Sequence, residues 1–228
     1  MKFKLSVFCF LIFLTCRVFA QTSDVTFEQL ELIGIGSISI PSIMELQAGL
    51  YKEFSDKRSN DFLIKKGIEA YENHIIFQQK GQNEFRKVNT YARVIIATEI
   101  GKAGDYRKIT SKISLTKQQL KTLDSEAKTE IEFSFQGTKL KIIRWDGVSV
   151  VTINGRSALK FAYLRQVSNN PPVYVELYQI DNYDRRYVLT ISYRQEDASI
   201  WEEVLRKTKN SFTVTNVKQP ITKKKRKR

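Results

Sequence analysis

Closely spaced turns in the second half of the chain constrain its fold more than any other sequence feature. Asn154-Gly155 precedes the run 159–167, and both residues accept the positive φ that a tight hairpin turn needs. Further turns are predicted at 169–172 and 181–185. Apolar and polar residues alternate over 173–178 and 187–193, which predicts strands. Strands joined by short turns pair antiparallel, so this half predicts an antiparallel sheet.

Other β-rich runs predict the rest of the sheet. They lie at 37–40 (ended by Pro41), 74–79, 91–99, 140–145, 148–153 and 211–214, the last as a closing strand.

Two segments have helical periodicity. Thr116 and Gln119 have the spacing of a capping box, and the apolar residues at 120, 123, 127 and 131 share one helical face. Asp197 is an N-cap candidate before a second apolar stripe at 200, 201, 204 and 205. The predicted class is α+β, a mainly antiparallel sheet with two or three helices packed on it.

The first 20 residues have the pattern of a cleavable secretory signal. Lys2 and Lys4 precede the apolar run Leu5–Cys16, and the cut is predicted between Ala20 and Gln21. The expected location is therefore secreted or periplasmic. A membrane anchor is the alternative, but the apolar run is shorter than the roughly 20 residues that span a bilayer. Lipid attachment at Cys16 is a further alternative, although Leu14-Thr15 before that cysteine is a poor lipid-attachment sequence.

Both cysteines, Cys9 and Cys16, fall within the signal. The mature chain therefore has no disulfide, thiolate metal site or cysteine nucleophile. We divide the chain into the signal (1–20), a polar lead-in (21–29), one α+β domain (30–215) and a basic disordered tail (216–228).

Basic residues are concentrated at the chain ends. The net charge is +14, but the signal and the last six residues account for most of it and leave about +5 for the rest. The candidate anionic-surface site is the tail, Lys223, Lys224, Lys225, Arg226, Lys227 and Arg228. Such a run is either a solvated tail or an adhesive one that binds an anionic polymer or membrane surface. It also resembles a nuclear-localisation patch. The signal argues against that role unless the protein is delivered into a host cell.

Catalytic motifs are missing from the sequence. The single histidine, His74, starts an apolar run, and a structural role is expected. We therefore assign no catalytic residue, and the sequence motifs imply no cofactor. Paired carboxylates could meet only in three dimensions, and the candidates for such a pair are Glu45, Glu72, Asp146 and Glu176.

Metal and phosphate motifs are equally weak. Asp181-Asn182-Tyr183-Asp184 lacks the ligands of a calcium loop and favours a polar turn. Gly34-Ile35-Gly36 precedes a strand, whereas a dinucleotide fingerprint precedes a helix. We therefore expect no metal site.

Five tyrosines lie on predicted strands of the second half: Tyr163, Tyr174, Tyr178, Tyr187 and Tyr193. Sheet packing explains them first. If one sheet face is uncovered, the same side chains would form a stacking surface for a sugar or a peptide.

The layout resembles the PsbP/Mog-like fold, and within it small exported bacterial proteins of unknown function. The resemblance covers about residues 30–215 and depends on Ile40-Pro41, Ile153-Asn154-Gly155, and the ending with Tyr193, Trp201 and Ser211-Phe212. It implies an antiparallel sheet flanked by helices and a domain that acts by binding. Some relatives dock on photosynthetic complexes and others bind a small GTPase, but no motif here matches their binding residues.

The sequence therefore favours an exported, non-catalytic binding or envelope-associated protein. The expected partner is another protein or an anionic envelope polymer, with peripheral membrane contact as a further mode and no role for nucleic acid. The alternative is a hydrolase acting on polysaccharide or peptide through carboxylates that the sequence does not identify. A concave site with two facing acidic groups would favour that alternative.

Overall fold

A seven-stranded antiparallel sheet forms the centre of the protein. The computed structural model describes residues 25–53 and 74–215, and its sheet has the strand order β3-β4-β5-β9-β8-β7-β6. Strands β1 and β2 form a separate two-stranded sheet. The strands are β1 (Phe27–Leu32), β2 (Gly36–Pro41), β3 (Met44–Leu46), β4 (His74–Gln79), β5 (Ala92–Ile100), β6 (Leu140–Ile153), β7 (Arg156–Val167), β8 (Val173–Asp181) and β9 (Arg185–Arg194). The predicted α+β class is confirmed.

The turn between β6 and β7 follows the sequence prediction. Asn154 and Gly155 have φ values of 44° and 76°, and Ile153 pairs with Arg156 across the turn. β6 differs from the prediction of two runs around residues 146 and 147, because it is one strand of 14 residues with two register shifts against β7. Bulges of this kind absorb the turn-like residues without ending the ladder.

Helix α2 (Lys117–Ser134) begins with the predicted capping box. The Thr116 hydroxyl accepts a hydrogen bond from the Gln119 backbone N–H, and the Gln119 side chain accepts one from the Thr116 backbone. Helix α3 (Ala198–Ser211) follows a 3₁₀ turn (Gln195–Asp197). Asp197 occupies the predicted N-cap position, but its carboxylate accepts from the Tyr91 backbone N–H at 2.9 Å instead of capping the helix.

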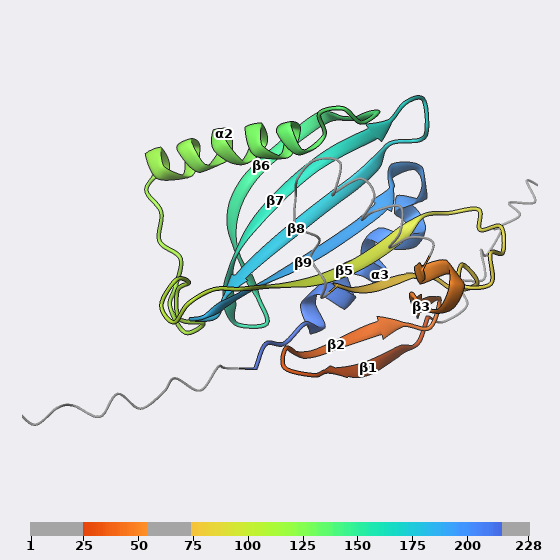
Figure 1. Ribbon diagram of the computed structural model, residues 1–228, viewed down its shortest axis with the longest axis horizontal. Helices are drawn as coiled ribbons and strands as arrows, with labels where there is room; N and C mark the ends of the chain where they lie inside the picture. The colour runs from red at the N-terminus through yellow and green to blue at the C-terminus, as the bar shows by residue number, and fades with distance from the viewer. Residues whose placement is uncertain (1–24, 54–73, 216–228) are drawn as a thin grey trace, which may run out of the picture.

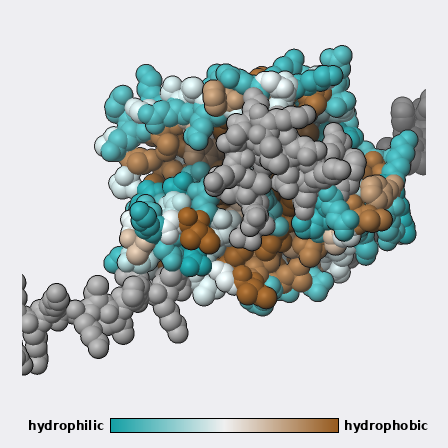
Figure 2. Space-filling view, in the orientation of Figure 1, coloured by the Kyte–Doolittle hydropathy of each residue, from teal (hydrophilic) through white to brown (hydrophobic). Residues whose placement is uncertain are grey.

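The two faces of the large sheet have separate apolar cores. On the face that we call the α3 face, side chains of β5, β8 and β9 pack with α3 and β2 around Trp201, Leu205 and Ile38. On the opposite α2 face, Ala127 of α2 packs on β6 and β7. In Figure 1, α2 lies along one edge of the view and the β1–β2 hairpin along the other. Figure 2 shows hydrophobic side chains gathered over that hairpin, whereas the outside of α2 is mostly hydrophilic.

The closing strand predicted at 211–214 is wrong. Ser211 ends α3, and the chain after it runs beside β2 as an irregular segment. Thr213 N–H donates to the Ser37 carbonyl at 2.8 Å, and Thr215 N–H donates to the Ile35 carbonyl at 2.7 Å. At the other end of the chain, β1 begins at Phe27, within the predicted polar lead-in.

Side chains from neighbouring segments bind both edge strands of the large sheet. At β3, the Asn83 amide donates to the Leu46 carbonyl and accepts from the Ala48 N–H. At β6, the Asp124 carboxylate accepts from the Val148 N–H at 2.7 Å. These contacts satisfy backbone groups that would otherwise be open to strand addition.

The predicted signal with its Ala20–Gln21 cleavage site, and the tail 223–228, lie outside the described residues. Within the described ranges, no helix has both the length and the apolar character needed to cross a membrane.

Candidate binding surface

Alternating residues of β8 bring polar side chains to the α3 face. Tyr174, Glu176 and Tyr178 point to the same side as Tyr193 of β9 and Lys160 of β7, as the strand registers require. Together with residues of β6 and α3, they form a connected set that we call the Glu176 network. Its members are Arg144, Asp146, Lys160, Tyr174, Glu176, Tyr178, Tyr193 and Lys209.

Glu176 lies at the centre of this network. One of its carboxylate oxygens, Oε1, is 2.7 Å from Lys160 Nζ, and the other accepts a hydrogen bond from the Tyr178 hydroxyl at 2.7 Å. The Lys160 and Glu176 side chains are 26% and 17% exposed. The ion pair is therefore reachable by a ligand, yet screened by solvent much less than a surface pair.

A second ion pair lies on β6, next to two aromatic rings. Arg144 donates to both carboxylate oxygens of Asp146, at 2.7 and 3.1 Å. Its guanidinium carbon is 5.8 Å from the centre of the Tyr174 ring, within range of a cation–π contact. The Tyr174 and Tyr193 rings meet edge to face with centres 5.7 Å apart.

Helix α3 contributes Lys209 to the network. The Lys209 ammonium lies 5.5 Å from the centre of the Tyr178 ring. Burial lowers the pKa of Lys209, and the negative charge of Glu176 opposes that change. Lys209 lies in the last turn of α3, and this helix packs against β2 and β9.

The network tyrosines have raised pKa values. For Tyr178, burial is the main cause, followed by the charge of Glu176 and its hydrogen bond with that residue. For Tyr174, burial is followed by the charges of Glu176 and Asp146. Burial, with nearby carboxylates, raises the pKa of Tyr193 to about 12. These phenols therefore stay neutral at physiological pH, and serve as hydrogen-bond donors and acceptors rather than as bases.

The carboxylates that sequence analysis considered for catalysis are engaged in other contacts. Asp146 pairs with Arg144, and Glu176 pairs with Lys160. Glu45 accepts from the Asn83 backbone N–H at 2.8 Å, and Glu72 lies outside the described residues. In glycosidases the acid and the second carboxylate stand free on both sides of the bond to be cleaved.

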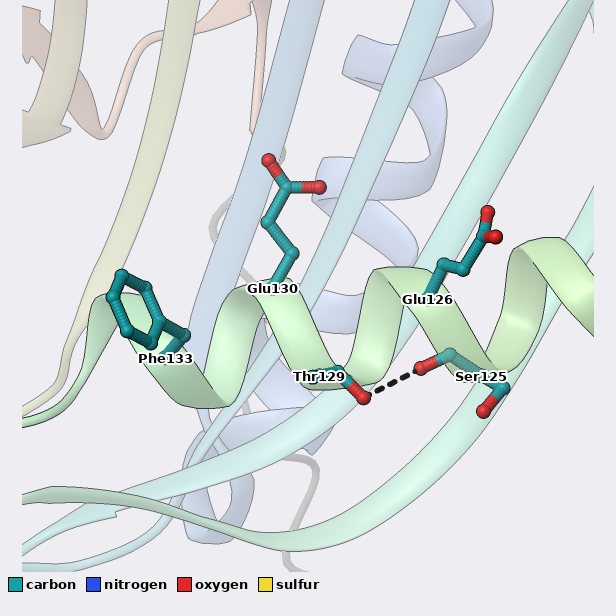
Figure 3. Close-up of a pocket in the computed structure, with 5 residues that line it drawn as sticks. All are labelled: Ser125, Glu126, Thr129, Glu130 and Phe133. Atoms are coloured by element: carbon teal, nitrogen blue, oxygen red, sulfur yellow. Dashed lines mark hydrogen bonds between the residues drawn. The ribbon is translucent and has the colours of Figure 1, made fainter.

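A depression on the outside of α2 contains two other glutamates. Figure 3 shows its lining residues, which all come from that helix: Ser125, Glu126, Thr129, Glu130 and Phe133. Glu126 and Glu130 are one helical turn apart and exposed. Thr129 uses its hydroxyl to bond the Ser125 carbonyl at 2.9 Å. Two solvated carboxylates side by side on one helix do not flank a substrate bond, so this depression gives no support to hydrolysis.

The turn at 181–184 joins neighbouring segments through arginine. Asp181 binds Arg107 at 3.0 Å and Arg186 at 2.9 Å, and Asp184 binds Arg185 at 2.8 Å. These carboxylates are thus occupied by guanidinium groups.

Across residues 25–53 and 74–215, no group of three or more acidic, histidine or cysteine side chains could hold a metal ion. His74 begins β4 as an exposed residue.

Part of this surface was predictable from the sequence. Of the five tyrosines, three belong to the Glu176 network, whereas Tyr187 is fully buried and donates to the Gly34 carbonyl at 3.1 Å. Tyr163 points to the α2 face and stacks with Trp145, with ring centres 6.0 Å apart. Lys160 and Lys209 were missed, because only the register of β7 against β8 and the placement of α3 bring them to Glu176.

Comparisons with known proteins give distant structural likenesses and no activity. No family model matches the chain, and no curated protein matches it. Among solved structures it is similar to cyanobacterial PsbP (CyanoP) from Synechocystis, with 11% identity and a TM-score of 0.49 over 86% of this chain and 96% of that one. It is also similar to a protein of unknown function from Pseudomonas aeruginosa, with 13% identity and a TM-score of 0.39 over 85% and 98%. The first of these is a PsbP protein, whose fold this sequence resembles; at these identities and TM-scores, neither likeness bears on activity.

Proposed function

We propose that this chain is exported and acts as a non-catalytic binding or envelope-associated protein. Residues 1–20 have the pattern of a secretory signal, and the chain beyond them has no cysteine. A cysteine-free chain suits any redox environment, because its stability does not depend on disulfides.

The Glu176 network is the observation that carries the binding function. Its two ion pairs and Tyr174 are reachable from solvent, whereas Tyr178 and Tyr193 are buried beneath them. Its tyrosines are neutral, and its carboxylates are paired with basic groups. Such a surface offers hydrogen bonds and aromatic contacts to a ligand, but no free nucleophile or general base.

Binding is tested by pull-down from the native envelope fraction. The exported wild-type protein is compared with Lys160→Glu, which reverses a charge in the network, and with Lys141→Glu, which makes the same change on an exposed residue of β6 outside it. We expect the captured material to be lost with Lys160→Glu and kept with Lys141→Glu, while circular dichroism confirms folding of all three. Equal capture by all three proteins would exclude the network as the binding surface.

Export is tested by expression of the full chain in a bacterial host, followed by fractionation and intact-mass measurement. We expect a product that begins at Gln21 and is found outside the cytoplasm. A chain lacking residues 1–20 is the control and should stay in the cytoplasm. Full-length protein retained with its first 20 residues would contradict the proposal.

The basic tail supports envelope association in a separate way. Basic residues contribute about 1 kcal/mol each near an anionic lipid surface, so six could hold the protein there weakly. Deletion of residues 223–228 should reduce cosedimentation with vesicles containing anionic lipid, and added salt should reduce it for the intact chain. Equal retention of both forms at low salt would exclude adhesion by the tail.

A further inference from the structure

We infer that the Glu176 network binds a polyhydroxylated ligand, namely a segment of a glycan with little net charge. This inference rests on the proposed binding function and specifies the ligand for the same surface. It follows from the order of donors and acceptors, the charge balance, the paired backbone beneath, and the aromatic rings.

Donors and acceptors alternate across the network at hydrogen-bond distance from one another. The Lys160 ammonium and the Tyr178 hydroxyl flank the two oxygens of Glu176, and the Arg144 guanidinium lies against Asp146. A sugar hydroxyl is a donor and an acceptor at once. Adjacent hydroxyls of a sugar ring can therefore bridge such a pair, giving a proton to the carboxylate oxygen and accepting one from the cation.

The charges of the network nearly cancel. Its cations are Arg144, Lys160 and Lys209, and its anions are Asp146 and Glu176, a balance of one positive charge. A highly anionic polymer would have to displace carboxylates that already hold these cations, at the cost of leaving them unpaired. The network therefore favours a neutral or weakly charged ligand over the anionic polymers that suit the basic tail.

Paired backbone beneath the network argues against an extended peptide. β7 pairs with β6 and β8, and β8 pairs with β7 and β9, along the residues of the network. Their N–H and C=O groups are used within the sheet, so a peptide strand placed across them could not join the ladder. Recognition has to come from side chains, as in glycan binding.

Aromatic rings complete the surface. Tyr174 is half-buried, its ring meets the Tyr193 ring edge to face, and the Arg144 guanidinium lies over it. These contacts hold the ring in place beside a hydrogen-bond donor, where a sugar can contact both. Strands β6 to β9 place the members of the network across three strand spacings, about 14 Å. A ligand of several sugar units is needed to reach from Arg144 on β6 to Tyr193 on β9.

The experiment measures binding of three neutral hexasaccharides, chitohexaose, cellohexaose and maltohexaose, to the exported full chain by calorimetry. A heparin hexasaccharide is the anionic comparison. We expect at least one neutral probe to bind, and Glu176→Gln to weaken it by about tenfold, as loss of a charged hydrogen-bonding group does. Tyr174→Phe, which keeps the ring, should weaken binding less than Tyr174→Ala. Glu130→Gln on α2 is the matched control and should leave binding unchanged.

Three results would overturn the inference. The first is no heat from any neutral hexasaccharide at millimolar concentration. The second is binding of the heparin probe alone. The third is neutral-probe binding that Glu176→Gln and both Tyr174 variants leave unchanged in folded protein. If the neutral probes fail while Lys160→Glu still abolishes capture from the envelope fraction, the glycan is wrong and the binding function stands. If Lys160→Glu also leaves that capture unaffected, both the glycan ligand and the binding function of the network are wrong.

Discussion

Replacement of Gly36 by alanine tests how the end of the chain is held in place. The Gly36 backbone has a φ of +157°, and a Cβ there would lie 2.1 Å from the Thr213 carbonyl oxygen and 3.0 Å from the Val214 Cα. Both of these are backbone atoms, which a rotamer change cannot move. The segment after α3 would have to shift away from β2.

The cost can be worked out from the bonds that such a shift breaks. They are Ser37 N–H to the Thr213 hydroxyl, Thr213 N–H to the Ser37 carbonyl, and Thr215 N–H to the Ile35 carbonyl. At about 0.5–1.5 kcal/mol each, their loss lowers the free energy of unfolding by about 3 kcal/mol, and the backbone conformation adds about 1–3 kcal/mol for any residue with a Cβ.

Gly34→Ala is the matched control. Gly34 also has a positive φ, +74°, but a Cβ there would meet no atom within 4 Å. Only the left-handed backbone is penalised, by about 1–2 kcal/mol. Urea unfolding should therefore show Gly36→Ala to be the less stable variant by at least about 2 kcal/mol, a difference well resolved by the midpoint. Equal unfolding free energies for the two variants would refute the close approach at Thr213.

Three further predictions concern other parts of the fold. Asp124→Ala removes the acceptor of the Val148 N–H and of the Trp145 indole, and should cost about 1–3 kcal/mol in urea unfolding with a change in tryptophan fluorescence; unchanged stability would contradict this edge contact. Asn83→Ala opens the edge of β3 and should increase light scattering on concentration; a monodisperse variant would argue against protection of the edge. The pKa of Tyr193 is raised from 10 to about 12 in the folded state. Its neutral form therefore stabilises the fold below pH 10, and that contribution disappears as pH rises through 12. The free energy of unfolding should fall across this window, and it should fall less steeply in Tyr193→Phe.

Local chemistry made parts of the fold predictable from sequence. The hairpin at Asn154-Gly155 depends on two residues that accept positive φ, and the start of α2 depends on Thr116 and Gln119 three positions apart. In both cases the stabilising atoms are close together in the chain. The pattern alone is then sufficient.

Other parts depend on contacts between distant segments. The strand predicted at 211–214 fails because α3 extends to Ser211 and the following backbone pairs with β2, more than 170 residues away. Asp197 has the sequence of a capping residue, yet its carboxylate bonds Tyr91. No local pattern contains these partners.

The exposure of the Glu176 network follows from how the two helices are placed on the sheet. α3 packs against β9 and β2, and α2 packs against β6 on the opposite face. The α3 face of β6 and β7 therefore receives no helix from either side of the described fold. The exposed residues there cannot all be apolar without leaving an exposed hydrophobic patch. Arg144 and Lys160 are polar, whereas Ala158, Ala162 and Leu164 of the same face are buried. An apolar substitution that keeps the length of the side chain, Lys160→Met, separates the two explanations for this polarity. If the charges served only solubility, it would leave envelope capture intact; loss of capture in a folded Lys160→Met protein would mean that the same charges hold the ligand.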